Sequence, residues 1–502
     1  MRLQNWSNSM TASGNAVVYE PVIGLEVHCQ LLTDSKAFSP DSAKFGAAPN
    51  RHVDPVSLGL PGSLPVLNAK VIEFAVRLGL AMNCEISERS VLARKHYFYP
   101  DLPKGYQISQ FENPICVAGY LDIESGRRIG ITRIHIEEDA GKSLHDQDPK
   151  YTLLDYNRCG VPLLEIVSEP DLRSGAEANR YMQKIRQLVR YLEISDGNME
   201  EGSLRCDANI SVRLEGEQVL GTKTEIKNMN SFRHVERAID YEVQRQTTLL
   251  GSGEDVTHET RLWDDTVGKT YPMRSKEEAH DYRYFPDPDL PPVLVTESTK
   301  ETIRANMPEL PDARYLNYVQ QFQLPEYDAG ILTEERSVAD YFERTLDSLY
   351  ALGTNDSLAS QAKTISNFVM GDVMRACKEK DVSMEGFPIQ PGRLAKLASL
   401  RMRSVISSSA AQTLFEAMIT DEREPGIIAK EQNLIQVSDR GTLQPVVESV
   451  LEENSKQVEM YFRGKESIIG FFIGQVMRQF KGAPDPKLVQ SLIKEELNRR
   501  RP

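Results

Sequence analysis

The stretch FPDPDLPP, residues 285–292, divides the sequence into two parts of different character. Proline restricts the residue before it and cannot donate a backbone hydrogen bond, so neither a helix nor a central strand is expected to run through this stretch. Before it, segments such as 131–137 and 208–213 alternate apolar and polar residues and predict strands with one wet face. After it, the sequence predicts helices and few strands. We therefore expect more than one domain, as the length of 502 residues also suggests.

Two helices are predicted within the strand-rich part. One follows Ser174, where Glu177 is placed for a capping box, and the other follows Ser231. Apolar residues recur at helical spacing in both, at Met182, Ile185, Leu188, Val189 and Leu192, and at Phe232, Val235, Ile239 and Val243. Because strands outnumber helices and do not alternate with them regularly, we expect an α+β domain with a mainly antiparallel sheet.

The part after residue 292 is predicted to be helical. Helices are expected over residues 300–322, 338–352 and 357–378, and a last one over 488–497. A second break, GFPIQPG at 386–392, lies between them.

Composition argues against several classes of function. The net charge of −14 argues against broad, nonspecific binding of nucleic acid, although the segment from Tyr461 onward holds nine Lys and Arg against four Asp and Glu. No apolar run approaches the roughly 20 residues of a membrane helix. The six cysteines form no C-x-x-C pair, which argues against a zinc ribbon or a disulfide framework and favours a reducing compartment.

Two tripeptides, Gly141-Lys142-Ser143 and Gly268-Lys269-Thr270, invite comparison with a phosphate-binding loop. That loop needs another glycine five residues before the one that precedes lysine, so that backbone amides can wrap the phosphates. Ile136 and Trp263 occupy those positions. Any nucleotide must therefore be held in another way.

Acidic residues gather at two places that could carry chemistry. Glu137, Glu138 and Asp139 stand together at the end of a predicted strand, so they are either spread into solvent or neutralised by a divalent cation. Glu165 lies inside the apolar run 161–167 and needs a cation, a metal or a hydrogen-bond network opposite it. A structural pair with an arginine is the alternative.

The segment VIGLEVHCQL, residues 22–31, places a carboxylate, an imidazole and a thiol close together. On a strand, Glu26 and His28 share a face while Cys29 points the opposite way. This geometry counts against a nucleophile pair of His28 and Cys29, and it predicts that Cys29 is a packing residue. Glu26 and His28 suit one half of a metal site, with the polar face of an ordinary sheet as the alternative.

Residues 94–107 mix basic and aromatic side chains with loop-forming prolines. Such a loop can grip a phosphate or stack a base. The alternative is an edge loop whose aromatic rings cap the core.

Several of these segments together resemble the family of B subunits of the tRNA-dependent amidotransferase, GatB. The segments are LDYNRCGVPLLE (154–165), YFYPD (97–101), YQISQ (106–110), MEEGSLRCDAN (199–209) and DYRYFP (281–286). The similarity runs from about Tyr19 to the C-terminus, and the motifs occur in the order of the family.

The resemblance implies a plan of domains. A flexible N-terminal extension, 1–18, precedes a cradle-shaped α+β domain, 19–294, with a mainly antiparallel sheet and a core similar to that of glutamine synthetase and guanidino kinases. An all-α helical domain, 295–404, and an α-helical, YqeY-like, tRNA-binding tail, 405–502, follow.

The resemblance also implies the reaction. The family is a carbon–nitrogen ligase that uses glutamine as nitrogen donor and converts Glu-tRNA(Gln) or Asp-tRNA(Asn) to the amide. ATP phosphorylates the side-chain carboxylate, and ammonia then displaces the phosphate. The implied partners are a GatA-type amidase, a GatC-type small subunit and tRNA(Gln) or tRNA(Asn), with neither DNA nor a membrane, and the implied location is the cytoplasm.

By matching motifs, the family's metal-binding set corresponds to Glu26, His28, Glu138 and Glu165, and the implied metal is Mg²⁺. Strand alternation does not choose between Glu137 and Glu138. Lys95 resembles a family lysine at the kinase site, suited to a nucleotide phosphate. Lys95, Glu138 and Glu165 are therefore the expected catalytic residues.

Two other functions compete with this one. The chain could be a non-catalytic tRNA-binding subunit that only positions substrate for its partners. It could also be an autonomous carboxylate–amine ligase acting on a small acid, which predicts activity without partner chains.

Overall fold

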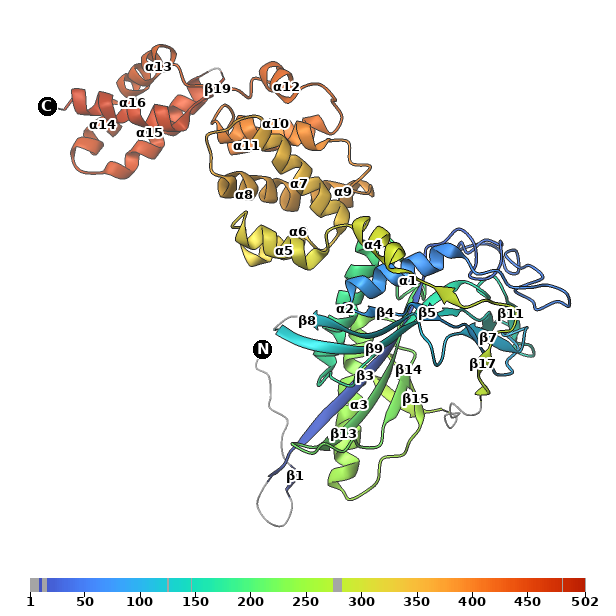
Figure 1. The fold of residues 1–502 in the computed structure, drawn as a ribbon. Coiled ribbons are helices and arrows are strands. Elements are labelled where there is room, and N and C mark those ends of the chain that lie inside the picture. Colours follow the sequence, from blue (N-terminus) through green and yellow to red (C-terminus); the bar gives the residue numbers. More distant parts are fainter. Residues whose placement is uncertain are drawn as a thin grey trace. The chain divides into compact units, whose positions relative to one another are not determined.

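The computed structural model describes residues 9–10, 16–123, 126–145, 147–273, 282–480 and 482–501. The chain forms two compact units, Met1–Pro311 and Asp312–Pro502 (Figure 1). Most of the extension expected over residues 1–18 lies outside the described residues. Within it, strand β1 (Ser9–Met10) pairs with strand β2 (Ala16–Val17).

A nine-stranded sheet forms the centre of the first unit, with the strand order β16-β15-β14-β13-β3-β12-β9-β8-β4 (Figure 1). Strands β14 and β15 run parallel, and the other neighbouring pairs of this sheet are antiparallel. The prediction of a mainly antiparallel sheet is therefore confirmed. The strands are β16 (Lys269–Pro272), β15 (Thr260–Asp264), β14 (Thr224–Lys227), β13 (Leu204–Leu214), β3 (Tyr19–Gln30), β12 (Pro162–Ser168), β9 (Arg127–Glu138), β8 (Cys116–Ile123) and β4 (Glu85–Ile86).

Three helices supply side chains to the core against this sheet: α1 (Ala69–Ala81), α2 (Gly175–Tyr191) and α3 (Phe232–Gly251). Helices α2 and α3 begin where the sequence predicts. The hydroxyl of Ser174 accepts a hydrogen bond from the Glu177 amide, and that of Ser231 accepts one from the His234 amide. The apolar stripe predicted for α2 is buried, and that of α3 packs on the same core.

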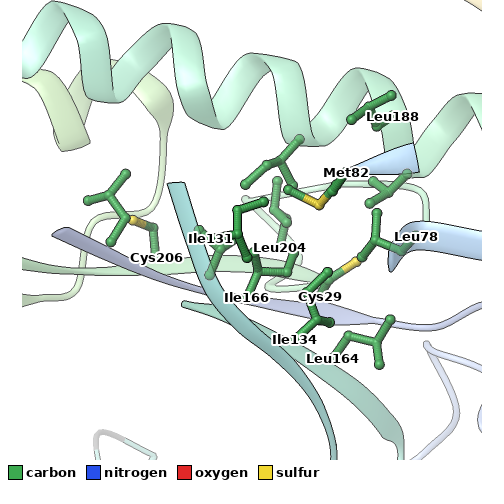
Figure 2. Close-up of a cluster of buried hydrophobic side chains, with 14 of the residues drawn as sticks. Cys29, Leu78, Met82, Ile131, Ile134, Leu164, Ile166, Leu188, Leu204 and Cys206 are labelled. Atoms are coloured by element: carbon green, nitrogen blue, oxygen red, sulfur yellow. The ribbon is translucent and has the colours of Figure 1, made fainter. Parts of the chain in front are cut away.

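Apolar side chains that point toward the helices alternate with polar ones along the strands. Figure 2 shows Cys29 of β3, Ile134 of β9 and Leu164 of β12 gathered with Leu78 of α1 and Leu188 of α2. Cys29 is fully buried in this cluster, which confirms the prediction that it is a packing residue. Because side chains alternate along a strand, its neighbours His28 and Gln30 point to the opposite face.

A small three-stranded sheet brings residues 94–107 together with the proline-rich stretch. Strand β6 (Ala93–His96) pairs with β7 (Tyr106–Ser109) and with β17 (Phe285–Pro286), so that Lys95 lies opposite Gln107. The Arg94 guanidinium donates hydrogen bonds to Asp287 and Asp289, at 2.7 and 2.8 Å. The proline-rich stretch is therefore part of the first unit as well as the place where strands give way to helices.

The first unit continues past that stretch. Strand β18 (Val293–Leu294) pairs with β5 (Arg89–Ser90), and helix α4 (Glu297–Ala305) packs against α1. The unit ends at Pro311, beyond the limit of 294 expected from the sequence. The expected domain limits, 19–294, 295–404 and 405–502, stay a prediction.

Helices of the second unit surround two apolar cores. The first core runs from Tyr318 to Ala429, and thus across residue 404, and the second from Leu443 to Leu497. The helices of the first core are α5 (Pro311–Gln320), α6 (Glu326–Leu332), α7 (Arg336–Ala351), α8 (Leu358–Phe368), α9 (Met374–Lys380), α10 (Pro391–Met402), α11 (Ser408–Met418) and α12 (Pro425–Glu431). Those of the second are α13 (Arg440–Glu453), α14 (Ser455–Phe462), α15 (Ile469–Gln479) and α16 (Pro486–Arg499).

Most of the predicted helices of this part are confirmed. Helix α7 corresponds to residues 338–352, α16 to 488–497, and α8 and α9, joined by the π-helical turn Val369–Val373, to 357–378. The segment 300–322 is largely helical, as predicted, but it is divided into two helices, α4 and α5. Pro308 and Pro311 lie at the break, where a continuous helix would lose hydrogen bonds and clash with the proline rings. Among the described residues, no helix is long and apolar enough to cross a membrane.

Candidate active site

The face of the large sheet opposite the buried cysteines carries polar side chains on neighbouring strands. Strand β3 lies between β12 and β13, so that His28 stands opposite Glu165 on one side and Arg205 on the other. Glu26 stands opposite Asp207 in the same way. Directly opposed residues project to the same face, so the register collects these side chains on one surface.

The first cluster on this face consists of His28, Glu137 and Glu165. Each offers a ligand atom, and these atoms lie within 4.8 Å of one another. The Nε2 atom of His28 is 3.5 Å from the Oε2 atom of Glu165. Sequence reasoning predicted His28 and Glu165 as partners, and the structure brings them together.

The register also separates Glu137 from Glu138. Glu137 stands opposite Leu163 of β12 and shares the face of Glu165, whereas Glu138 points the other way. There the carboxylate of Glu138 forms an ion pair with Lys104 and accepts a hydrogen bond from the Ile108 amide at 2.9 Å. The structure thus does not bring Glu138, the predicted ligand, to the cluster, and Glu137 stands in that place.

Hydrogen bonds hold Glu137 in position. Ser109 donates to its Oε1 atom at 2.8 Å, and the Gln107 side chain donates to its Oε2 atom at 3.0 Å. The Nε2 atom of His135 lies 3.1 Å from Glu137 and 3.2 Å from Glu165, between the two carboxylates. Glu137, Glu165 and His135 are all less than a tenth exposed, so these contacts decide where the ligand atoms stand.

The charges of this cluster balance one another. Burial opposes ionisation of Glu165, but His135 and His28 outweigh it and hold the pKa of this carboxyl well below its ordinary value. Burial works against the charge on His135 too, yet Glu165 and Glu137 raise its pKa to about 9. On its other side, the Nδ1 atom of His135 lies 3.3 Å from Arg133 Nε. A divalent cation held by these carboxylates would replace the imidazolium charge.

Lys95 lies beside the first cluster. Its ammonium group stands 5.0 Å from the centre of the Tyr282 ring. Burial disfavours the charge, but the attraction of Glu137 outweighs it, with smaller contributions from Tyr284 and Glu165, and raises the pKa of Lys95. Within the described ranges, no carboxylate lies at ion-pair distance from this ammonium. The cation is therefore available to an anionic ligand.

A second acidic cluster contains Glu26, Asp207 and Glu225, from strands β3, β13 and β14. Their ligand atoms also lie within 4.8 Å of one another. Asn209 donates to Glu26 at 2.8 Å, and Thr260 donates to Glu225 at 2.8 Å. Glu26 therefore belongs to a different cluster from His28, so the metal-binding set expected from the sequence is divided between two places.

A pocket of about 750 Å³ borders the second cluster. Its lining includes Asp207, the basic residues Lys142, Arg158 and Arg205, and the apolar Met199 and Met229. The Arg158 side chain donates to the carbonyls of Ala140 and Gly141, at 2.9 and 2.7 Å, and Arg205 donates to Asp139 at 2.9 Å. Positive charge is thus fixed at the edge of an acidic sheet face.

Sequence reasoning missed several residues of the site, among them Gln107, Ser109, His135, Asp207 and Glu225. The sequence could have pointed to three of them. His135 precedes Glu137 by two residues in a predicted strand, and two others lie inside quoted motifs, Asp207 in 199–209 and Gln107 in 106–110. Ser109 is in that last motif too, but nothing in the sequence distinguished its role, and Glu225 had no signal.

Taken together, the two clusters offer oxygen and imidazole ligands of the kind that divalent cations prefer. A lysine and a pocket with fixed arginines adjoin them, which suits binding of a phosphorylated ligand. Cys29 is buried on the far face, and burial raises its pKa to about 12, so its thiol cannot act as a nucleophile here. The arrangement suits phosphoryl transfer supported by cations.

Two family models and several known proteins match this chain. Residues 21–301 match the family model of the GatB/GatE catalytic domain, and residues 353–497 match that of the GatB domain. The B subunit of the aspartyl/glutamyl-tRNA(Asn/Gln) amidotransferase of Salinibacter ruber is 58% identical over 96% of this chain and 98% of its own length. The corresponding B subunits of Chlorobium limicola and Chlorobaculum tepidum are 54% and 53% identical, each over 96% of this chain and 99% of their own length.

Proposed function

Because this chain belongs to the GatB family, the B subunits of the aspartyl/glutamyl-tRNA(Asn/Gln) amidotransferases, we propose that its first unit carries the amidation site of such an enzyme. The reaction is the ATP-dependent conversion of Glu-tRNA(Gln), Asp-tRNA(Asn) or both to the amide. The nitrogen comes from glutamine, which a GatA-type amidase hydrolyses, and a GatC-type small subunit completes the complex. The proposed location is the cytoplasm.

Amidation of a carboxylate needs activation, because oxide is too poor a leaving group. Transfer of the γ-phosphoryl group of ATP to the side-chain carboxylate gives an acyl phosphate and ADP. Ammonia then attacks the acyl carbon, the C–O bond to phosphate breaks, and inorganic phosphate leaves as the amide forms. The site must therefore hold ATP and the aminoacyl end together and must neutralise the charge on the phosphoryl group.

The observation that supports this proposal most is the pair of acidic clusters on one face of the sheet. His28, Glu137 and Glu165 would hold one Mg²⁺, and Glu26, Asp207 and Glu225 a second. Glu26 and His28 are two residues apart on one strand, about 7 Å, so both sites serve one reacting centre. When bound, the cations neutralise the phosphoryl oxygens.

The other residues of the site have matching proposed roles. Lys95 would face the phosphoryl group while it is transferred. Its ammonium is available for this contact because it has no carboxylate partner among the described residues. The pocket beside Asp207 is large enough for ATP, and Arg158 and Arg205 offer positive charge to its phosphates. His135, Ser109 and Gln107 would orient the ligands. We also propose that the core of the first unit is similar in fold to the core of glutamine synthetase and guanidino kinases.

The basic C-terminal segment is proposed to contact tRNA. Its lysines and arginines would bind phosphates of the RNA body, which gives affinity that depends on salt. Truncation near Gln390 should then weaken tRNA binding and flatten its salt dependence, while glutaminase activity is kept. Unchanged affinity for tRNA after this truncation would contradict the role of the segment.

The test of the proposed function is the variant Glu165→Gln in the complete complex. We expect ATP hydrolysis that depends on Glu-tRNA(Gln) or Asp-tRNA(Asn), and amide formation, to fall by about 100-fold or more, because a ligand is lost. Glutamine hydrolysis and tRNA affinity should be kept. The exposed Glu169 at the end of β12 supplies the matched control, Glu169→Gln. Normal turnover by Glu165→Gln would favour a subunit that only positions tRNA.

A further inference from the structure

Aromatic rings form a continuous group outward from Lys95. They come from three places: the loop after β6, the segment after β7, and residues 282–285, of which only Phe285 pairs with β6. Tyr282 lies against the Lys95 ammonium at 5.0 Å, and Tyr284 lies 6.1 Å from Tyr282 between ring centres. Phe111 then stacks on Tyr284, with centres 4.3 Å apart and 7° between the ring planes. We call Tyr282, Tyr284 and Phe111 the aromatic platform.

The platform is anchored to the candidate active site. Ser109, which donates to Glu137, precedes Phe111 by two residues. Gln110, between them, accepts hydrogen bonds from the amides of Ile115 and Ile136 and ties the segment to β9. The position of Phe111 relative to the first cluster is therefore fixed by strand β7 and by these bonds.

The outer end of the platform is open. Phe111 is 46% exposed although one face lies on Tyr284, so its other face meets solvent. Tyr106 packs against the apolar core of the unit, whereas Phe111, Tyr282 and Tyr284 are outside that core. For residues 94–107 the sequence left open whether the aromatic rings cap the core or bind a base, and Tyr106 of that segment does pack on the core. The platform residues lie outside both that segment and the core.

We propose that Phe111 and Tyr284 stack the terminal nucleobase of the aminoacyl-tRNA and so place its aminoacyl group beside Lys95. This inference rests on the proposed function. The acyl group is esterified to the terminal ribose, so the base of that nucleotide must lie within one nucleotide of the reacting carboxylate. Single-stranded RNA ends are commonly recognised by stacking on aromatic side chains, and a ring on the outer face of Phe111 continues the existing stack.

The proposal commits to RNA and not to the adenine of ATP. The pocket proposed for ATP borders Asp207 and the arginines of the sheet face, and the platform contributes no residue to its lining. The platform instead continues from Lys95 and the first cluster, where the carboxylate of the substrate has to lie. The adenine of ATP and the terminal nucleobase of the tRNA would therefore occupy different places.

The test measures binding of two RNA hairpins to the complete complex. One carries an acceptor stem with an unpaired 3′ end, and the other is identical except that its terminal nucleotide has no base. Wild type should bind the intact RNA about 5- to 100-fold more tightly than the abasic one, the usual contribution of one stacked base. In Phe111→Ala this preference should disappear, and Phe111→Trp should keep it. Tyr271→Ala is the matched control, since Tyr271 on β16 is equally exposed at 46%.

Each outcome decides the proposal. A full preference for the intact RNA in Phe111→Ala would overturn it, as would an effect on the KM for ATP with RNA binding unchanged. Loss of the partner subunits on gel filtration of Phe111→Ala, with RNA preference kept in the assembled fraction, would mean that the platform is a protein interface. Failure of the proposed function is separate, because it would show as absent amidation by wild type, whereas failure of this inference leaves wild-type amidation intact.

Discussion

The two acidic clusters lie on one sheet face but neutralise their charge differently. In the first, the histidines His28 and His135 face the carboxylates, and a proton can leave an imidazole when a cation arrives. In the second, the ammonium of Lys227 lies 2.5 Å from Asp207 and 3.6 Å from Glu225, a permanent charge inside the cluster. If the clusters hold cations as proposed, the first would bind its cation more tightly, because in the second the cation would compete with a lysine.

The largest expected effect comes from removing one ligand from each cluster. We expect Glu137→Gln to lower amidation by about 100-fold or more and to abolish the tighter Mn²⁺ binding, while Asp207→Asn removes only the weaker binding. Electron paramagnetic resonance of Mn²⁺ titrations measures both affinities, and amide formation is assayed in parallel. Equal loss of both bound ions in each variant would break the comparison, because it would mean that the clusters form a single site.

The next effect separates Glu137 from its neighbour Glu138. Glu138→Gln leaves the Lys104 ammonium buried without its partner, so the free energy of unfolding should fall by about 3 kcal/mol. Mn²⁺ affinity should stay unchanged in the fraction that remains folded, because Glu138 faces away from the first cluster. Urea denaturation followed by fluorescence measures the stability. A loss of Mn²⁺ affinity as large as in Glu137→Gln would restore Glu138 as the ligand.

A smaller effect is expected from the residue that orients the first cluster. His135→Gln removes the contact with Glu137 and Glu165, so we expect Mn²⁺ affinity to fall about 10-fold or more and the KM for Mg²⁺ to rise, with kcat nearly kept at saturating Mg²⁺. His234→Gln, on helix α3, is the control. If the KM for Mg²⁺ stays constant while kcat falls, His135 takes part in the reaction itself and does more than position ligands.

The smallest effect should come from Lys227. Lys227→Gln removes the ammonium that competes for Asp207 and Glu225, so cation affinity of the second cluster should increase by several-fold, while the first cluster is unaffected. Isothermal titration with Mn²⁺ distinguishes the two events. A decrease in affinity would show that Lys227 holds the carboxylates in place for the cation, and the contrast between the clusters would then lose its physical basis.

Much of the architecture could be predicted from local pattern. Ser174 and Ser231 mark where α2 and α3 begin because the cap bonds are made within one turn of the helix. The predicted helical segment 300–322 is divided near Pro308 and Pro311, because a continuous helix cannot run through two prolines. The site was harder to predict, since its ligands come from five strands far apart in the sequence.

The sequence by itself determined which side chains of a strand can act together. Alternation separated Cys29 from Glu26 and His28, and it placed Glu137 and Glu138 on opposite faces, because successive side chains of a strand diverge. Only the tertiary structure decided which of those faces carries the cluster. The pairing of β9, β12 and β3 put Glu137 beside Glu165 and His28, and the pairing of β3 with β13 gave Glu26 to Asp207. Register is a relation between distant segments, and no periodicity within one strand contains it.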